Sequence, residues 1–177
     1  MSGRDPELQR LLDRQAIVEC LHRYSRGLDR HDEELLASAF HPDAIDHHGH
    51  FLGPPHVFVP WANELHATSW AAHTHFLDVG FVEIEGDIAH SECYVLFVLR
   101  RKEGTGVDLG GGRYLDRLER REGEWRIAAR ELIVEWHCNA DGASFGRLNA
   151  EYPSGTWDSS DPSYRRPFEI PSRRPPG

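Results

Sequence analysis

The sequence predicts an α+β fold in which helices come first and a long, curved, antiparallel or mixed β-sheet follows. Apolar residues recur at helical spacing near the start of the chain. From about Thr74 the pattern changes to four β-rich runs that short glycine-containing turns separate. Helices packed in the concavity of such a sheet form a cone. We therefore expect residues 1–138 to form a cone-shaped domain that encloses a pocket covered by the N-terminal helices.

Two helices are expected in the first part of the chain. The first covers residues 6–28. Its apolar stripe consists of Ile17, Leu21, Tyr24 and Leu28. Gly27 should loosen its last turn, and Asp32 can cap the second helix. Pro42 stops that helix, because the residue before a proline avoids helical backbone angles.

The middle of the chain predicts less regular structure. Residues 44–55 are rich in histidine, glycine and proline, so a strand there should be short and interrupted. A third helix is expected over residues 57–67, and Pro60 should start or kink it.

Four strands should then form an antiparallel meander. Their expected ranges are 76–85, 88–99, 107–120 and 125–136. The triplet Gly110–Gly112 lies inside the third of these strands. No helix pattern and no Gly-Lys-Ser/Thr sequence follows it, so a β-bulge is favoured over a phosphate loop.

Residues 139–177 are rich in Gly, Ser, Asn and Pro and should form an irregular tail. Trp157, Tyr164 and Phe168 are too apolar for a fully solvated segment. We expect them to anchor the tail on the same subunit or on a neighbouring one.

Composition argues against several classes of partner. The net charge is -9, with 29 acidic and 20 basic residues, which disfavours nucleic-acid binding. Three distant cysteines without a C-x-x-C pair suggest buried thiols in a reducing compartment. The polar N-terminus lacks a signal-peptide pattern, and no apolar run is long enough to span a bilayer. A cytoplasmic protein without membrane or nucleic-acid partners is expected.

Four residues could carry chemistry: Tyr24, Asp29, His75 and Arg130. A histidine oriented by a carboxylate is a good base near neutral pH. An arginine in a largely apolar strand needs a partner if it points inward, and it can hold an oxyanion. Each residue also has a plainer interpretation. Tyr24 fits the core, Asp29 a helix end and His75 an exposed strand start, while Arg130 could point outward toward Glu131 or Glu119.

A second candidate is the histidine-rich segment around His47-His48-Gly49-His50. Adjacent strand residues point to opposite faces, so His47 and His48 cannot easily share one ion. The segment also lacks an H-E-x-x-H pattern. We therefore predict no metal site, and we expect His48 or His50 to line a pocket instead.

Several runs together resemble a known family. They are RQAI at 14–17, YSRGLD at 24–29, FHPDA at 40–44, His75 before a strand, and ERREGEWRI at 119–127 leading to Arg130. In order and spacing they resemble the SnoaL-like group of the nuclear transport factor 2 / ketosteroid isomerase superfamily. The resemblance covers roughly residues 10–137 and is strongest to the branch of scytalone dehydratase, bile-acid dehydratase and hexachlorocyclohexane dehydrochlorinase.

This resemblance implies a cofactor-free lyase, in particular a dehydratase, that acts on a hydrophobic cyclic molecule. It places the base on His75, the orienting carboxylate on Asp29, and polar donors on Tyr24 and Arg130. A tyrosine five residues before the aspartate is similar to bile-acid dehydratase, whereas the dehydrochlorinase has a lysine there.

Further expectations follow from the same resemblance. The side chains expected to line the pocket are His48, Phe40, Phe51, Trp61, Trp70 and Trp136. A homotrimer is favoured, with a dimer as the alternative. Three other functions stay open. They are an isomerase or cyclase with the same base, a non-catalytic small-molecule-binding domain, and a small subunit similar to the β subunit of ring-hydroxylating dioxygenases.

Overall fold

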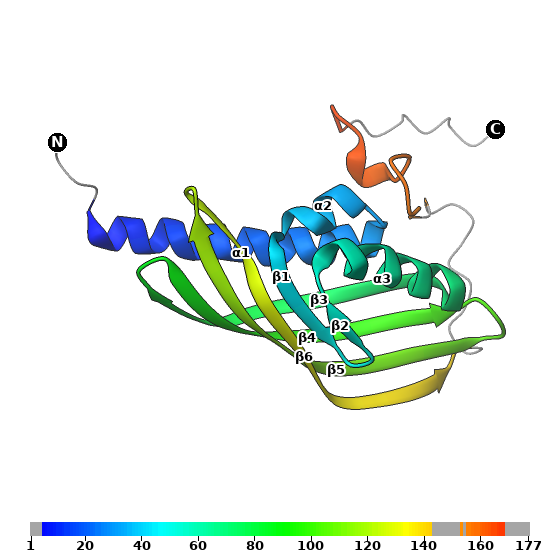
Figure 1. The fold of residues 1–177 in the computed structure, drawn as a ribbon. Coiled ribbons are helices and arrows are strands. Elements are labelled where there is room, and N and C mark those ends of the chain that lie inside the picture. The colour runs from blue at the N-terminus through cyan, green and yellow to red at the C-terminus, as the bar shows by residue number, and fades with distance from the viewer. Residues whose placement is uncertain (1–4, 143–152, 154, 169–177) are drawn as a thin grey trace.

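The chain folds into helices packed on one curved sheet (Figure 1). The structure is a computed structural model that describes residues 5–142, 153 and 155–168. In this part of the chain the α-helices are α1 (Pro6–Arg30), α2 (Glu33–Ser38) and α3 (Pro55–Ser69). The strands are β1 (Phe40–His48), β2 (Phe51–Gly53), β3 (Trp70–Glu85), β4 (Ile88–Arg101), β5 (Gly106–Arg121) and β6 (Glu124–Asp141).

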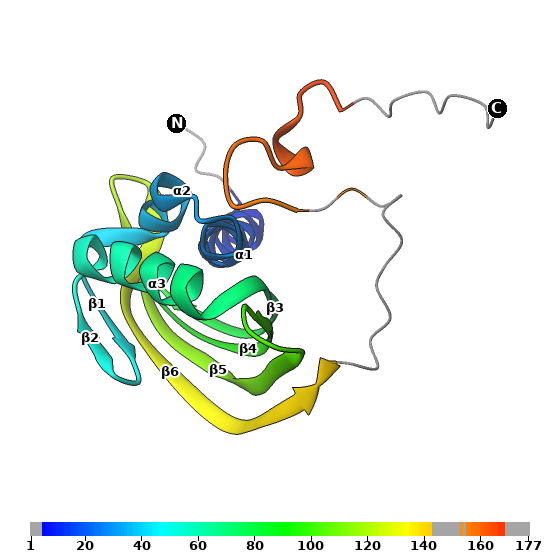
Figure 2. The ribbon, with the colours of Figure 1, turned by 90° about the vertical axis from the view of Figure 1, so that its right-hand side faces the viewer.

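All of these strands belong to a single 6-stranded sheet with the order β2-β1-β6-β5-β4-β3. The pairs within β3 to β6 are antiparallel, as the predicted meander requires, whereas β1 pairs with β6 in parallel. The sheet curves beneath α1 and α3 without closing on itself (Figure 2). The predicted α+β cone with a mixed sheet is therefore confirmed.

Both N-terminal helices begin at a capping aspartate. The Asp5 side chain accepts a hydrogen bond from the backbone N–H of Glu7, and the Asp32 side chain accepts one from Leu35 at 3.0 Å, as predicted. Helix α1 continues to Arg30, beyond its predicted end, and stops where His31 adopts a left-handed conformation with φ 52°. Helix α2 ends at Ser38, so Pro42 lies in β1 rather than directly after the helix.

Gly27 does something other than loosen a helix turn. A β-carbon at this position would lie 2.5 Å from the backbone nitrogen of Leu36 in α2. Side chains cannot occupy that space, so Gly27 lets α1 and α2 approach closely. This role was not predicted, because sequence spacing says nothing about which backbone approaches a given residue.

Helix α3 begins at Pro55 and passes through Pro60 without a break. Proline is tolerated in the first turn, where Pro55 lies, because no intrahelical partner exists there for its missing N–H. Pro60 removes one further hydrogen bond, yet the helix continues to Ser69. The prediction that Pro60 starts the helix was wrong.

The predicted bulge lies beside the glycine triplet, but its extra residue is Glu135 of the neighbouring strand β6. The register between β5 and β6 shifts between Gly111 and Gly112. The Phe97 ring fills the space over Gly110, and the Trp136 ring fills the space over Gly111, on opposite faces of the strand. The triplet therefore lets two aromatic rings lie flat against the sheet.

The core lies between the apolar stripe of α1 and the concave face of the sheet. Ile17, Leu21 and Tyr24 are each 0% exposed. Near the start of α1, Asp13 accepts hydrogen bonds from Arg120 and from the Trp125 indole, which fixes the helix against the sheet. Cys20 and Cys93 are buried, as predicted, whereas Cys138 is exposed because it lies near the end of β6.

The C-terminal part that the structure describes lies against the end of α1. The Tyr164 hydroxyl donates a hydrogen bond to Asp32 at 2.7 Å, and the Arg26 guanidinium lies over the Tyr164 ring. Phe168 is 66% exposed. Strand β6 reaches Asp141, so the irregular segment starts later than predicted. In the described residues no helix combines the length and apolar character that crossing a bilayer requires.

Candidate active site

The end of α1 and the middle of β3 bring Asp29 and His75 together. Asp29 Oδ1 lies 2.7 Å from His75 Nδ1, and Asp29 Oδ2 accepts a hydrogen bond from the His75 backbone N–H at 3.0 Å. A carboxylate can only accept, so Nδ1 carries the proton and Nε2 keeps its lone pair. The His75 side chain is only 7% exposed. The pair is therefore an oriented imidazole whose free nitrogen can take a proton.

Tyr24 and Arg130 belong to a neighbouring cluster. The Arg130 guanidinium carbon lies 3.9 Å from the centre of the Tyr24 ring and 4.2 Å from that of Tyr114. Its Nε and Nη2 donate to the two Asp116 oxygens at 2.6 and 2.9 Å. Both side chains of the Arg130–Asp116 pair are 0% exposed. Among the described residues, no hydrogen bond or ion pair joins Tyr24, Arg130 or Asp116 to His75.

This geometry corrects the expectation for Arg130. Its partner is Asp116, and neither Glu131 nor Glu119. Burial disfavours the charged form, but the Asp116 carboxylate outweighs it and raises the Arg130 pKa. Arg130 also packs against the two tyrosine rings, and its Nη1 has no hydrogen-bond partner among the described residues.

The two tyrosines are neutral hydrogen-bond donors. Burial raises the pKa of Tyr24 well above its ordinary value and also raises that of Tyr114. The buried Tyr24 hydroxyl interacts with the Tyr114 hydroxyl, although this contact falls short of good hydrogen-bond geometry. An oxygen that enters the interior with better geometry could take up this donor.

A second histidine–carboxylate pair lies on β1 and was not predicted. His48 Nδ1 lies 3.0 Å from Oδ1 of Asp46, whose side chain is 0% exposed. The His48 ring centre is 5.8 Å from that of Tyr114. The signal in the sequence is the two-residue step, since residues i and i+2 of a strand share a face. His48 was expected to line the pocket, but its buried carboxylate partner was missed.

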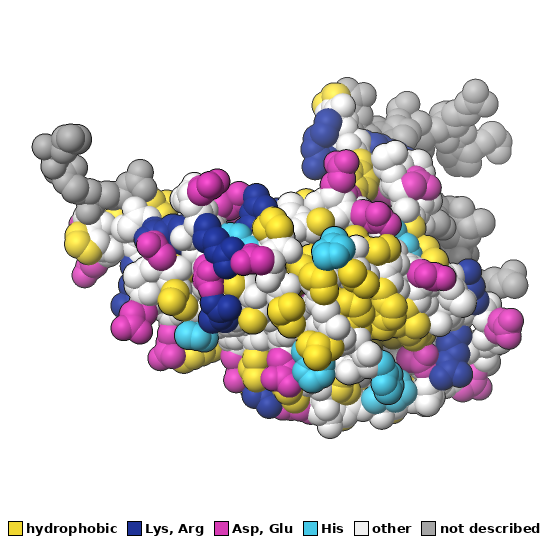
Figure 3. Space-filling model, viewed as in Figure 1, with side chains coloured by type: hydrophobic (Ala, Val, Ile, Leu, Met, Phe, Trp, Pro, Cys, Tyr) yellow, Lys and Arg dark blue, Asp and Glu magenta, His cyan; other side chains and the backbone are white. Residues whose placement is uncertain are grey.

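Most of the predicted aromatic residues gather around Phe58 of α3. The Phe58 ring centre lies within 6.0 Å of those of Phe40, Phe51 and Trp61. Outside this cluster, hydrophobic side chains cover α3 and β2 in Figure 3. The exposed apolar residues of these two elements are Leu52, Val57 and Leu65. This side of the cone is therefore apolar on both its inner and outer surfaces.

Two predicted residues lie elsewhere. Trp136 packs over Gly111, on the face opposite to Phe97, whose ring centre is 6.3 Å from that of His75. Trp136 is 49% exposed, and the expectation that it lines the interior was wrong. The bulge at Gly111 shifts the alternation of β6, which sequence spacing alone does not reveal. Trp70 donates a hydrogen bond to Asp108, near the start of β5, at 2.9 Å.

Comparison with known families identifies the fold family. Residues 9–131 match the family model described as a SnoaL-like domain. The chain belongs to this family. The SnoaL-like domain is part of the nuclear transport factor 2-like superfamily, so the predicted membership is confirmed. No curated protein sequence matches this SnoaL-like chain.

Solved structures share the SnoaL-like fold at low sequence identity. A hexachlorocyclohexane dehydrochlorinase, LinA-type3 from Novosphingobium barchaimii, is 23% identical, with a TM-score of 0.73 over 80% of this chain and 99% of that one. A putative scytalone dehydratase from Novosphingobium aromaticivorans is 21% identical, with a TM-score of 0.66 over 75% and 89%. At such identities the likeness establishes the fold alone.

This SnoaL-like domain also gathers histidines beside the Asp29–His75 pair. The ring centres of His66 and His73 are 4.2 Å apart, and each lies 5.8 Å from that of His75. Burial lowers the pKa of His66 to about 2 and that of His73 to about 4. Both rings are therefore neutral at physiological pH. Sequence reasoning missed them because they come from α3 and β3, and only the fold brings them together.

The histidine-rich segment of β1 behaves differently. His47 points outward, where its Nδ1 lies 3.2 Å from Glu131 and both side chains are about half exposed. His48 points inward to Asp46. The two rings thus occupy opposite faces of the strand, as their adjacency predicted.

Proposed function

We propose that this SnoaL-like domain is a cofactor-free lyase, and specifically a dehydratase that acts on a hydrophobic cyclic hydroxy-carbonyl compound. The observation that carries the proposal is the double contact between Asp29 and His75, at 2.7 and 3.0 Å. It fixes both the position of the imidazole and the nitrogen that stays unprotonated. The dehydratase and dehydrochlorinase named among the structural relatives make proton abstraction the chemistry to test first.

The proposed reaction begins at His75 Nε2, which takes a proton from the carbon next to the substrate carbonyl. Negative charge then develops on the carbonyl oxygen, and the buried Tyr24 hydroxyl is the donor assigned to it. As the carbon–oxygen bond to the leaving hydroxyl breaks, a carbon–carbon double bond forms. The His75 imidazolium, which Asp29 stabilises, returns its proton to the leaving oxygen, and water departs.

The remaining polar groups support this step from the opposite wall. His48 is oriented by Asp46 and lies near Tyr114, so it can contact the substrate oxygen atoms. Arg130 acts through Tyr24 and Tyr114, whose rings it holds. The phenylalanine cluster around Phe58 would receive the apolar body of the substrate.

The test uses a panel of cyclic β-hydroxyketones in D2O. Deuterium exchange next to the carbonyl is followed by NMR, and formation of the unsaturated ketone by its absorbance. His75→Ala should lower both rates by about 10²–10⁴-fold, because it removes the general base. Asp29→Asn should also lower both rates, because an amide does not stabilise the imidazolium.

Exposed His90 on β4 provides the matched control. His90→Ala should retain both rates. Unchanged exchange in His75→Ala would overturn the base assignment. Exchange without release of water would instead indicate an isomerase that uses the same base.

A further inference from the structure

Three buried imidazole nitrogens converge at one point next to the end of α1. They are His31 Nε2, His66 Nδ1 and His73 Nδ1, and none has a hydrogen-bond partner among the described residues. One ligand atom from each ring lies within 4.8 Å of the others. The residues come from the C-cap of α1, from α3 and from β3, so only the tertiary fold assembles them.

Three buried ring nitrogens without hydrogen-bond partners require a bound ion or water. A buried polar atom without a partner is disfavoured, and an ion or an ordered water is a usual explanation when one occurs in a folded protein. Here the three histidines each bring a ring nitrogen close to the other two. Neutral imidazoles that share a small space cannot all donate to each other, whereas a cation would satisfy all three at once.

The contact on the far side of His73 fixes the tautomer that a metal requires. Its Nε2 donates to the Leu28 carbonyl at 3.1 Å, so in the neutral ring Nδ1 keeps a lone pair that has no partner among the described residues. Metal-binding histidines commonly donate their second ring N–H to a carbonyl or carboxylate in this way. Asp29 Oδ1 lies 3.9 Å from the same Nε2, which adds a negative charge behind the ligand.

We propose that His31, His66 and His73 form a binding site for one divalent transition-metal ion, of which Zn²⁺ is the best suited. The donor set consists of three imidazoles, which Zn²⁺ binds readily, and it leaves a fourth tetrahedral position open. Zn–N bonds are about 2.0–2.1 Å long, so the ion would draw the rings closer together than they are without it.

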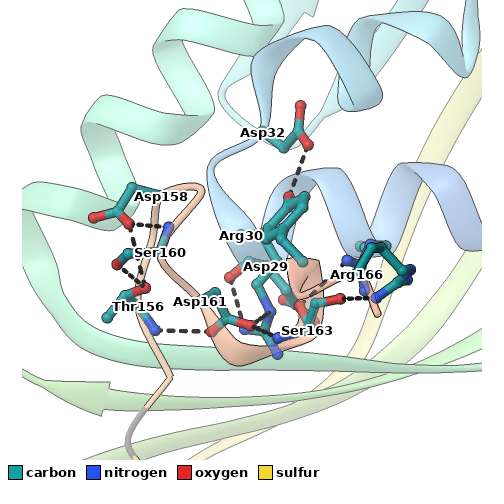
Figure 4. A network of polar contacts seen from close by, with 11 residues as sticks. Asp29, Arg30, Asp32, Thr156, Asp158, Ser160, Asp161, Ser163 and Arg166 are labelled. Carbon is teal, nitrogen blue, oxygen red and sulfur yellow. Dashed lines mark hydrogen bonds and ion pairs between the residues drawn. The ribbon is translucent and has the colours of Figure 1, made fainter. Parts of the chain in front are cut away.

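The proposed metal site is covered, and it lies beside the proposed base His75 without including it. The Trp157 ring stacks on His31 at 4.2 Å with an interplanar angle of 9°, and it lies 5.1 Å from His73. Figure 4 shows the segment of residues 156–163 beside Asp29 and Arg30, where Asp161 Oδ1 lies 3.8 Å from Arg30 Nε. A bound ion would therefore join α1, α3 and β3 under this segment.

The experiment starts with full-length protein freed of metal by a chelator. Titration with Co²⁺ should produce visible absorbance typical of tetrahedral coordination that saturates at one equivalent. Competition with Zn²⁺ should abolish this absorbance. His66→Ala should weaken Zn²⁺ binding by at least about 100-fold, since even loss of a supporting contact around a metal ligand costs 10–100-fold.

Two further variants make the result interpretable. His31→Asn removes an imidazole while retaining a residue type that accepts the left-handed conformation of this C-cap, so the variant should fold and still lose the site. The double variant His47→Ala/His50→Ala removes histidines of the histidine-rich segment and should bind like the original chain. Absence of Co²⁺ or Zn²⁺ binding to the original chain overturns the proposal. Full binding by a folded His31→Asn variant, or loss of binding in the double variant, also overturns it.

Discussion

At the scale of single residues, the Arg130–Asp116 pair shows how a charge is kept in the interior. Both side chains are 0% exposed, and two hydrogen bonds join them. The rings of Tyr24 and Tyr114, which contact each other edge to face, pack against the guanidinium and exclude water from it. Removing one partner of such a pair leaves an uncompensated buried charge, which costs far more than the pair itself contributes.

We therefore predict that Asp116→Ala lowers the free energy of unfolding by about 3–5 kcal/mol, measured by urea denaturation. The double variant Arg130→Met/Asp116→Leu should recover most of this loss, because apolar side chains of similar volume can replace a buried ion pair. A loss below about 1 kcal/mol in Asp116→Ala would mean that Arg130 is not held in this way.

At the scale of elements, the junction between α1 and α2 depends on one glycine. A β-carbon on Gly27 would lie 2.5 Å from the Leu36 nitrogen and 2.7 Å from its α-carbon. These are backbone atoms, so no side-chain rotation can relieve the clash. The same junction carries Asp29 and the C-cap His31, and hence it positions both the proposed base and the proposed metal ligand.

Gly27→Ala should destabilise the protein by about 1–3 kcal/mol, because overpacking forces the backbone of α2 to shift. Gly80→Ala is the matched control. Its β-carbon would meet nothing within 4 Å, and its φ is not positive. The free energy of unfolding of this control, measured by chemical denaturation, should stay within about 0.5 kcal/mol of that of the original chain. Equal effects of the two substitutions would contradict the close approach of α1 and α2.

At the scale of the whole molecule, Asp161 orders a C-terminal segment that lies against the helical layer, and its Oδ1 is 3.8 Å from Nε of Arg30 in α1. Its carboxylate accepts backbone hydrogen bonds from Thr156 and Ser163, both at 2.9 Å. Burial raises the Asp161 pKa, but these hydrogen bonds together with Arg30 outweigh it and lower the pKa to about 2. The Asp161 carboxylate therefore stabilises the folded state fully above its unfolded pKa of about 3.9. This stabilisation is lost as the pH falls toward 2.

Asp161→Asn should consequently release Trp157 from His31 at neutral pH, since an amide accepts these hydrogen bonds less strongly. The expected readout is a red shift of tryptophan fluorescence with unchanged far-UV circular dichroism. Asp158, which lies in the same segment, gives the control. It accepts from Ser160 at 2.7 Å but is fully exposed, so Asp158→Asn should shift the emission much less. Identical spectra for both variants would show that Asp161 does not hold the segment.

Much of the fold could be predicted because its signals are local. The 3.6-residue spacing of Ile17, Leu21 and Tyr24 describes one face of α1, and residue alternation with glycine turns describes the meander. The pairing of Asp29 with His75 was predicted from the order of residues typical of the family. The trimeric assembly stays a prediction. Exposed apolar surface that a neighbouring subunit could cover is present on the sheet at Phe76, Tyr94 and Leu96.

What the sequence determined by itself is thus the element order, the cone architecture and the pairing of Asp29 with His75. Tertiary structure alone decided that Asp116 is the partner of Arg130, that Trp136 faces outward, and that His31, His66 and His73 converge. The physical reason is that periodicity determines which face of an element a side chain occupies. Strand register, bulges and close backbone approach then determine which distant side chain it meets.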